Sequence, residues 1–231
     1  MWELSSQFNL IDARFFPAPS HILHHLFFVS PDEGILTDIS ASLSRVLWGY
    51  LSGCTLGIVI GVAMGMNHVA RNLFYPIVAL SYPIPKIAIL PLIMLIFGIG
   101  EMSKIIVVAI GSFFLVLMNT LHGVENLAKI YHDVAQVYSI SLRNRIFKII
   151  LPGALPSIFT GLRLAIGYSL VIVVAAEFSG ADAGIGYLIW QSWETFSIKS
   201  MYAGIFVISA LGFTFAMTLD WLERKLVPWK L

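Results

Sequence analysis

The sequence predicts an all-α polytopic membrane protein, and its composition and apolar runs carry the prediction. Of the 231 residues, 58% are hydrophobic and 12% are charged, whereas soluble domains are usually about a quarter charged. The mean hydropathy is +0.86. A helix needs about 20 apolar residues to cross a bilayer, and five stretches of the chain meet this requirement. The net charge of +1 gives no indication of a nucleic-acid partner.

The expected spans cover residues 42–66, 72–98, 103–121, 154–176 and 202–223. The second contains Pro83 and Pro85, and prolines remove backbone donors and clash with the preceding turn. We expect a kink or a short unwound piece there, which a membrane tolerates only where protein or a polar cavity covers the freed carbonyls. The chain thus divides into an N-terminal segment, 1–40, and one transmembrane domain, 41–231.

Basic residues beside the spans set the orientation. The segment 122–151 carries four of them, and the end of the chain carries more, so both are expected in the cytoplasm. The loops 99–102 and 177–200 are mainly acidic and are expected outside, together with the segment 1–40. All loops agree with this single topology. The sequence therefore predicts one five-span unit embedded in the lipid bilayer.

The first span carries Gly53, Gly57, Gly61 and Gly65, which are spaced by four residues. Small residues at this spacing line one helix face and let another backbone approach closely. That backbone could belong to the same chain or to a second copy, and we expect packing within the chain. Cys54 is the only cysteine, so the sequence offers no disulfide framework and no cysteine-based metal site.

Other polar patterns do not indicate a catalytic or metal site. His21, His24 and His25 have the spacing of a metal-binding face, but no Asp or Glu accompanies them closely, and an interfacial helix is expected instead. The glycines at 180, 184 and 186 follow no strand, so they fit an outer loop or short re-entrant helix rather than a dinucleotide fingerprint. No nucleophile, base and orienting group stand together as an enzyme requires.

The cytoplasmic segment 122–151 is too long for an ordinary connection. Connections in helical bundles usually take about 2 to 8 residues. Apolar residues at helical spacing predict an amphipathic helix over 124–139. Ser139 and Ser141 are good N-caps, a second short helix is expected at 141–150, and Pro152 suits the first turn of the next span. These helices could lie on lipid, fold onto the bundle or fit a groove on a partner.

This segment resembles the coupling loop of permease subunits in binding-protein-dependent ABC importers. The family pattern is Glu-Ala-Ala, three residues, Gly, nine residues, Ile-x-Leu-Pro. The chain has Asp133-Val134-Ala135, then Ser139, then Ile149-Ile150-Leu151-Pro152, without a gap. Glycine permits a sharp turn at no steric cost, whereas Ser139 can cap the next helix, which would make the turn differently. The resemblance implies that the ATPase-coupling residues are Asp133, Val134, Ala135, Ser139, Ile140, Ile149, Leu151 and Pro152.

Further motifs are similar to the nitrate, sulfonate, taurine and bicarbonate branch of the family. They are Pro17-Ala18-Pro19-Ser20, Ser42-Leu43-Ser44-Arg45-Val46, Ile84-Pro85-Lys86-Ile87-Ala88 with Leu90-Pro91-Leu92, Phe97-Gly98-Ile99-Gly100-Glu101, Gly161-Leu162-Arg163 and Ala176-Glu177. The family usually has one more span before the Trp2-Glu3-Leu4 that opens this chain. Either the chain starts downstream of the natural start or it is a five-span version.

The resemblance implies a type I importer fold in a bacterial inner membrane. Two permeases, alike or different, would form the pathway, and a second copy of this chain is expected. Two ATPase subunits would each take a coupling helix, and a binding protein would deliver substrate outside. The chain has no G-x-x-x-x-G-K-[ST] phosphate loop. It is therefore expected to hold no cofactor and to be no enzyme, with ATP and Mg bound by the partner ATPase. Basic residues within the spans favour a small anion as the solute.

Three charged residues fall at or within the spans. Lys86 lies beside the proline break, Arg163 lies near the middle of the fourth span, and Glu177 lies at its outer end. A buried basic residue costs at least about 2.5 kcal/mol on insertion, so it usually faces a pathway or a partner. Lys86 or Arg163 could line an anion route, with Pro83 and Pro85 freeing backbone groups. Alternatively, either could pair with Glu177 or with carbonyls.

Three other functions remain open at this point. A secondary transporter or channel working alone is the main alternative, although five spans cannot divide into equal inverted halves. A permease for a vitamin precursor would share the same motifs. A membrane enzyme ranks last, since no catalytic cluster is visible.

Overall fold

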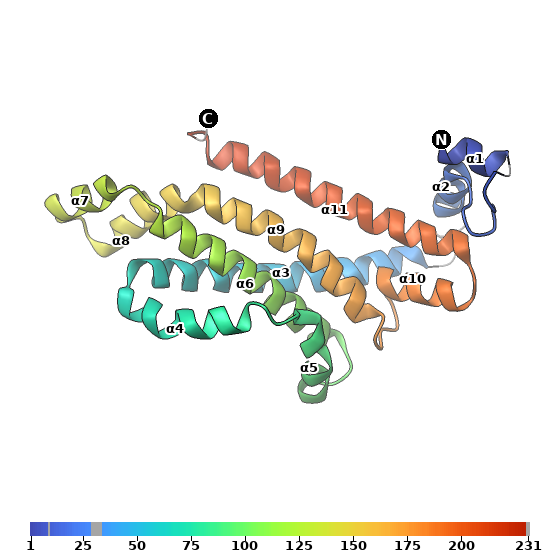
Figure 1. Ribbon diagram of the computed structural model, residues 1–231, viewed down its shortest axis with the longest axis horizontal. Coiled ribbons are helices and arrows are strands. Elements are labelled where there is room, and N and C mark those ends of the chain that lie inside the picture. The colour runs from blue at the N-terminus through green and yellow to red at the C-terminus, as the bar shows by residue number, and fades with distance from the viewer. Residues whose placement is uncertain (9, 29–33, 230–231) are drawn as a thin grey trace.

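The computed structural model describes residues 1–8, 10–28 and 34–229, and these residues form helices without a strand. Four long helices run along one axis: α3 (Ile35–Met66), α6 (Glu101–Glu125), α9 (Leu151–Glu177) and α11 (Ile198–Leu226) (Figure 1). By length and composition each can cross a membrane. The predicted all-α polytopic fold is confirmed. Residues 29–33 of the expected N-terminal segment and residues 230–231 lie outside the described part.

The second predicted span, 72–98, is not one straight helix. It consists of α4 (His68–Ser81), the 3-10 turn η1 (Lys86–Ile89) and α5 (Leu90–Phe97), and its two halves are bent by 89°. Pro83 and Pro85 lie at the bend, which confirms the expected break. Pro91 lies in the first turn of α5, where a missing N–H is tolerated.

The helices begin before the other predicted spans, and all of them except α3 also end after them. α3 begins at Ile35 rather than near residue 42, and α11 continues to Leu226 rather than 223. The first predicted span started late because hydropathy counts the charge of Asp38, and the last one stopped at Glu223 before the basic residues Arg224 and Lys225. Inside the protein, the Asp38 carboxylate accepts a hydrogen bond from Gly184, and Glu223 pairs with Arg163.

The glycines of α3 form a seam with α6. A Cβ atom would lie 2.9 Å from the Phe113 carbonyl oxygen at Gly57, 2.8 Å from the Thr120 Cβ at Gly61 and 2.6 Å from Val124 at Gly65. Because real Cβ contacts are not this short, only glycine lets the two backbones lie so close. The expected packing within the chain is therefore confirmed.

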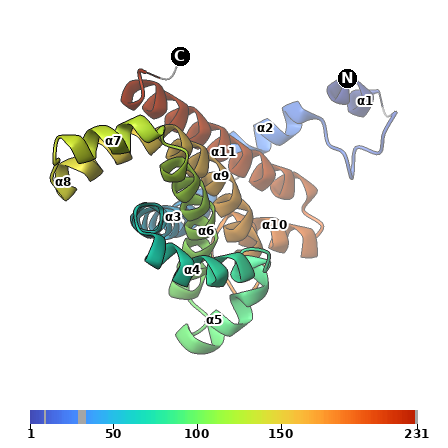
Figure 2. The same cartoon turned by 60° about the vertical axis from the view of Figure 1, so that its left-hand side comes forward.

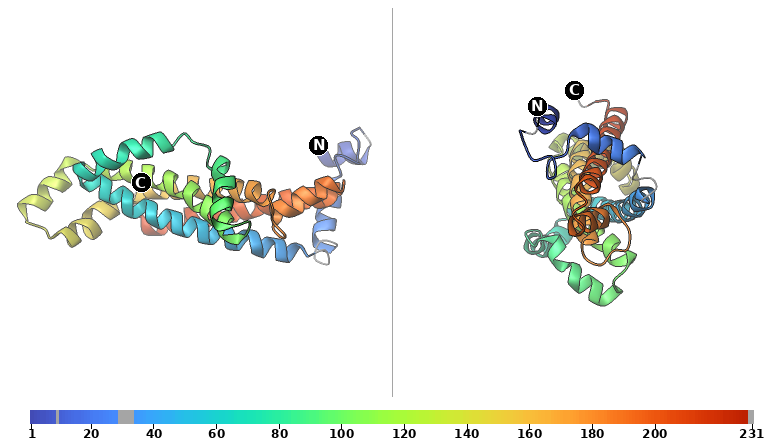
Figure 3. Two further views of the ribbon diagram at one scale, coloured as in Figure 1. Left: turned by 90° about the horizontal axis from the view of Figure 1, so that it is seen from below. Right: turned by 90° about the vertical axis from the view of Figure 1, so that its right-hand side faces the viewer.

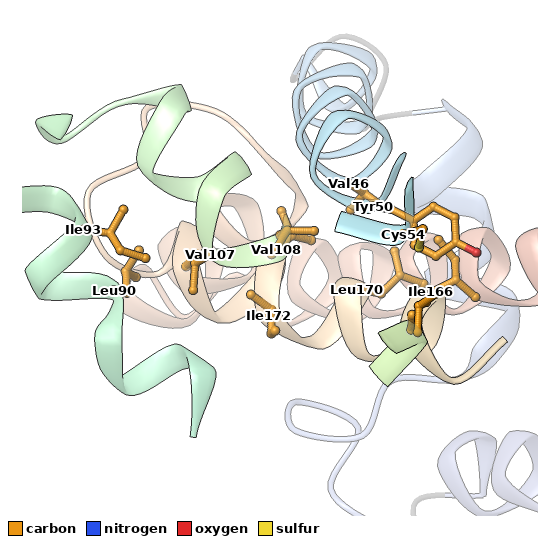
Figure 4. Close-up of a cluster of buried hydrophobic side chains, with 14 residues drawn as sticks. Val46, Tyr50, Cys54, Leu90, Ile93, Val107, Val108, Ile166, Leu170 and Ile172 are labelled. Carbon is orange, nitrogen blue, oxygen red and sulfur yellow. The ribbon is translucent and has the colours of Figure 1, made fainter. Parts of the chain in front are cut away.

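The main apolar core lies between α3, α6, α9 and the α5 region (Figure 4). Val46, Tyr50 and Cys54 of α3 face Ile166 and other side chains of α9 across it. Cys54 is 4% exposed, and as a small core residue it needs no chemical role.

The shorter helices lie at opposite ends of the bundle. α1 (Trp2–Gln7), α2 (Pro19–Phe28) and α10 (Ile185–Glu194) lie at the end where α11 begins (Figures 1 and 3). α7 (Lys129–Val137) and α8 (Leu142–Arg145) project from the other end (Figure 2). The short helix expected around the glycines at 180–186 is α10. Its neighbour α11 begins at Ile198.

Candidate functional site

The turn that follows α7 centres on Ser139. This residue has φ 47°, in the left-handed region. The Ile140 amide donates to the Ala135 carbonyl at 3.0 Å, and the Ser139 amide donates to the Gln136 carbonyl at 3.0 Å. These two bonds define a Schellman C-cap, whose left-handed position is usually occupied by glycine. Ser139 therefore makes the turn as glycine would. It does not cap the next helix, which starts after Ser141.

The helices around this turn differ from the predicted ones. The amphipathic helix expected over 124–139 is interrupted, since α6 ends at Glu125 and α7 begins at Lys129. The Asn126 side-chain amide donates to the His122 carbonyl at 2.9 Å, and such local bonds compete with helix continuation. The helix expected at 141–150 consists of α8 and the π-turn η2 (Ile146–Ile150), which leads directly into α9. Pro152 lies in the first turn of α9, as predicted.

The projecting segment exposes apolar surface rather than covering it. Ala135 is only 4% exposed, but most of its large apolar neighbours are open. The exposed ones are Ile130, Tyr131, Val134, Val137, Tyr138, Leu142 and Phe147. A hollow of about 550 Å³ adjoins them, between α7 and the start of α9, and Ile149, Pro152 and Trp229 form part of its wall. The segment thus offers a surface that the rest of the described chain leaves uncovered.

The Lys86 side chain binds the free backbone carbonyls at the break in the second span. Its ammonium donates to the carbonyls of Ser81 at 2.5 Å, Ile84 at 3.0 Å and Tyr82 at 3.2 Å. It also lies 4.2 Å from the centre of the Phe114 ring, and the residue is 4% exposed. The carbonyls freed by the proline break are therefore satisfied by this side chain. A hollow of about 360 Å³ lies beside it, lined in part by Tyr82, Phe114 and Tyr168.

Arg163 and Glu177 each have partners other than those expected. The Arg163 guanidinium contacts Asp220 at 2.6 Å and Glu223 at 2.5 Å, both on α11. Glu177 does not pair with Arg163 or Lys86. Its carboxylate accepts hydrogen bonds from Arg45 at 2.7 Å, Ser42 at 2.7 Å and the Gly186 amide at 2.8 Å.

The Glu177 contacts belong to a larger buried polar network at the outer end. Arg45 also contacts Glu101 at 2.5 Å and donates to the Ala183 carbonyl at 2.7 Å. Ser42 accepts from the Ile185 amide at 2.8 Å, and Asp38 accepts from the Gly184 amide at 2.7 Å. The network joins α3, α6 and α9 to the turn that precedes α10.

Sequence reasoning did not identify Asp38, Ser42, Arg45 or Glu101 as functional positions. One signal was available. Charged residues recur at the outer ends of three apolar runs, and such residues are costly unless they find partners. The partners themselves are up to 146 positions apart, so only the fold reveals which residues meet.

The comparisons decide the family. Residues 53–228 match the profile of the family described as binding-protein-dependent transport system inner membrane component. The chain belongs to this family.

Individual relatives extend the match to nearly the whole chain. The taurine transport system permease protein TauC of Escherichia coli is 34% identical over 99% of this chain and 85% of the relative. The putative aliphatic sulfonates permease SsuC of Bacillus subtilis is 30% identical over 100% of this chain and 83% of the relative. A MetNI methionine ABC transporter structure superposes with a TM-score of 0.72 at 16% identity, covering 83% of this chain and 95% of the solved one. This last match shows the type I importer fold alone.

Membership defines the biochemical role of the chain. It is a multi-pass inner-membrane permease subunit of an ABC importer. ATP is hydrolysed by a separate ATPase subunit, and a substrate-binding protein completes the system. The alternatives of a transporter that works alone and of a membrane enzyme are therefore set aside.

Proposed function

We propose that two copies of this chain form the pathway for a small oxyanion-bearing solute. Relatives at 30–34% identity are named for taurine, aliphatic sulfonates, nitrate and bicarbonate. Each of these solutes carries an oxyanion group. The exposed faces of the long helices support a second copy, since the most apolar stretch of α11 is only 11% buried within one chain. Lipid or that second copy covers the remainder.

The observation that carries the coupling role is the turn at Ser139. A left-handed residue at the glycine position of the family pattern presents α7 clear of the bundle, with Val134 40% exposed. We infer that Asp133 and Val134 enter a groove on the ATPase, which binds ATP and Mg, while Ala135, 4% exposed, packs α7 from behind. Ser139 and Ile140 set the angle of α7, and Ile149, Leu151 and Pro152 anchor α9 behind it.

For the pathway, we infer different roles for the three charged residues. Lys86 places a positive charge beside the hollow at the bend formed by Pro83 and Pro85, and such a charge between low-dielectric walls raises the local concentration of anions. Arg163 pairs with Asp220 and Glu223, and Glu177 pairs with Arg45, all within the chain. Their role is to hold α9 to α11 and to α3.

The test is co-purification followed by transport. Chains tagged in the native membrane should bring down an ATPase that mass spectrometry identifies. Val134→Arg should abolish this recovery, because an arginine at an exposed contact disturbs docking without disturbing the core. Gln7→Arg, at the opposite end of the molecule, is the matched control.

The recovered complex, reconstituted with its binding protein, should take up taurine, ethanesulfonate, nitrate or bicarbonate in an ATP-dependent manner. Recovery of the chain without an ATPase contradicts the coupling role. ATP-dependent uptake of neutral or cationic solutes only contradicts the anion assignment and leaves the coupling role intact.

A further inference from the structure

A cavity of about 590 Å³ opens at the outer end of the molecule, away from the coupling segment. Its walls come from α2, the residues before it and the start of α11. The two helices are in contact at this end of the molecule (Figures 1 and 3). Its volume is within the usual range for small-molecule sites, about 300–1,000 Å³. The family match begins at residue 53, so α2 is outside the matched region. The walls are formed by Ala13, Arg14, Pro17, His21, His25, Phe196, Ser197, Ile198 and Lys199.

The charged residues of this wall are all basic. Among the described residues that line the cavity, Arg14 and Lys199 are cationic, His21 and His25 are imidazoles, and none is acidic. Asp12 lies close by, but its carboxylate contacts the Arg14 guanidinium at 2.8 Å. That contact holds the pKa of Asp12 below its ordinary value. Glu3 is likewise engaged, since the Ser20 hydroxyl donates to it at 2.7 Å.

The charge of Arg14 is therefore neutralised by Asp12, and the remaining full positive charge of the cavity wall comes from Lys199. The first turn of α11 adds to it, because the N-terminus of a 29-residue helix carries a partial positive charge. His21 and His25 are four positions apart and lie on the same face of α2. His25 is held by the Ser200 hydroxyl at 2.9 Å, and Ser200 in turn contacts the Ser197 hydroxyl at 2.9 Å.

His24 does not share this environment. Its ring lies 4.9 Å from the Phe28 ring and is not part of the cavity wall. The three histidines therefore diverge, and the metal-like spacing seen in the sequence does not produce a common site. The remainder of the wall is apolar, from Ala13, Pro17, Phe196 and Ile198. A ligand that suits both the basic and the apolar part of the wall has an oxyanion head and a short apolar tail.

We propose that this cavity binds a small organic oxyanion, a sulfonate or carboxylate, at the outer mouth of the permease. Lys199 and His21 donate to the oxyanion, His25 completes the basic wall, and the apolar residues hold the tail. The inference rests on the proposed function in one respect, since an importer of such anions gives the site its purpose. Binding itself is measured without transport, so the two proposals fail separately.

The experiment uses the complete transporter in nanodiscs, without its binding protein. Ethanesulfonate is titrated, and its saturation-transfer difference NMR signal gives Kd. His21→Gln and Lys199→Gln should each weaken binding about ten-fold, as expected for loss of one charge-assisted hydrogen bond. His24→Gln, on the same helix, and Lys225→Gln, at the other end of α11, should leave Kd unchanged. Ethyl methyl sulfone, which has the same tail without charge, should not bind.

Two results would overturn the proposal. One is the absence of saturable ethanesulfonate binding to the wild type. The other is a Kd that is the same in His21→Gln, Lys199→Gln and the controls, which would place the anion elsewhere. Uptake assays of the same variants then report separately on the transported solute.

Discussion

Arg45 and Glu177 are 132 positions apart in the sequence, yet their side chains form an ion pair of 2.7 Å. The side chains are 3% and 0% exposed. A buried pair of this kind contributes little net stability compared with apolar residues, but removing one partner leaves an uncompensated charge. The pair therefore fixes where α9 ends against α3, and with it the turn that leads into α10.

Glu177→Gln should lower the free energy of unfolding of the permease by up to about 3–5 kcal/mol, because Arg45 loses its buried counter-charge. Thermal unfolding in detergent, followed by fluorescence-detected size exclusion, measures the loss. Glu101→Gln removes the other carboxylate that contacts Arg45, but the Glu101 side chain is 63% exposed, so its loss should be small. Equal losses of stability in Glu177→Gln and Glu101→Gln would show that burial of a carboxylate does not determine how much its ion pair with Arg45 contributes.

Ser139→Gly should stabilise α7 and its turn by about 1 kcal/mol, since glycine adopts the left-handed region without strain. Hydrogen exchange of the α7 amides should slow accordingly. Ser139→Val should accelerate exchange, because a β-branched residue is a genuine outlier at positive φ. Ser141→Gly serves as the control in the same loop. Faster exchange in Ser139→Gly than in the wild type would rule out the left-handed turn.

Gly57→Ala should destabilise the bundle, because the added methyl group meets the Phe113 carbonyl oxygen at 2.9 Å and Val116 at 3.1 Å. Gly167→Ala is the matched control, because a Cβ atom there has no neighbour within 4 Å. In the middle of a helix that control should be neutral or stabilising, by up to about 1 kcal/mol. Thermal midpoints of the two purified variants provide the comparison. If both shift in the same direction, the seam between α3 and α6 is not as tight as described.

Lys86→Met should lower the thermal stability and abolish uptake, because the Tyr82 and Ile84 carbonyls at the bend lose their donor. Each unsatisfied buried group costs about 1–3 kcal/mol, whereas the Ser81 carbonyl keeps the Ile84 amide. Lys86→Arg retains donors and charge, so it should restore stability. If Lys86 also attracts the anion, Lys86→Arg should retain uptake with an altered KM. Lys225→Met, at an exposed lysine near the end of α11, controls for loss of charge. Normal uptake by a stable Lys86→Met variant would exclude both roles.

Much of the fold follows from local signals in the sequence. Apolar length predicted α3, α6, α9 and α11, and Pro83 and Pro85 predicted the bend. Local signals did not reveal how far the helices extend, because hydropathy treats Asp38 as a terminator although its carboxylate has a partner within the protein.

The candidate site could be predicted less completely. The residue spacing placed a turn at Ser139, but not its left-handed geometry, since that depends on the hydrogen bonds that end α7. The partners of Arg163 lie 57 and 60 positions away on another helix, as the numbering of Asp220 and Glu223 shows. No single sequence specifies such pairs. Arg45 was visible only as part of a family motif.

The glycine seam also determines which parts of the permease can move. Similar close contacts join α6 to α9, where a Cβ atom at Gly123 would lie 2.6 Å from Ser157 and one at Gly161 would lie 2.8 Å from Asn119. Helices held backbone to backbone cannot slide or tilt without clashing, so α3, α6 and α9 form a static frame. Among the described residues, the bend at 82–85 lies outside these seams, between two helix halves set at 89°. We therefore expect α3, α6 and α9 to move as one body in a conformational cycle, with changes of shape taken up outside them.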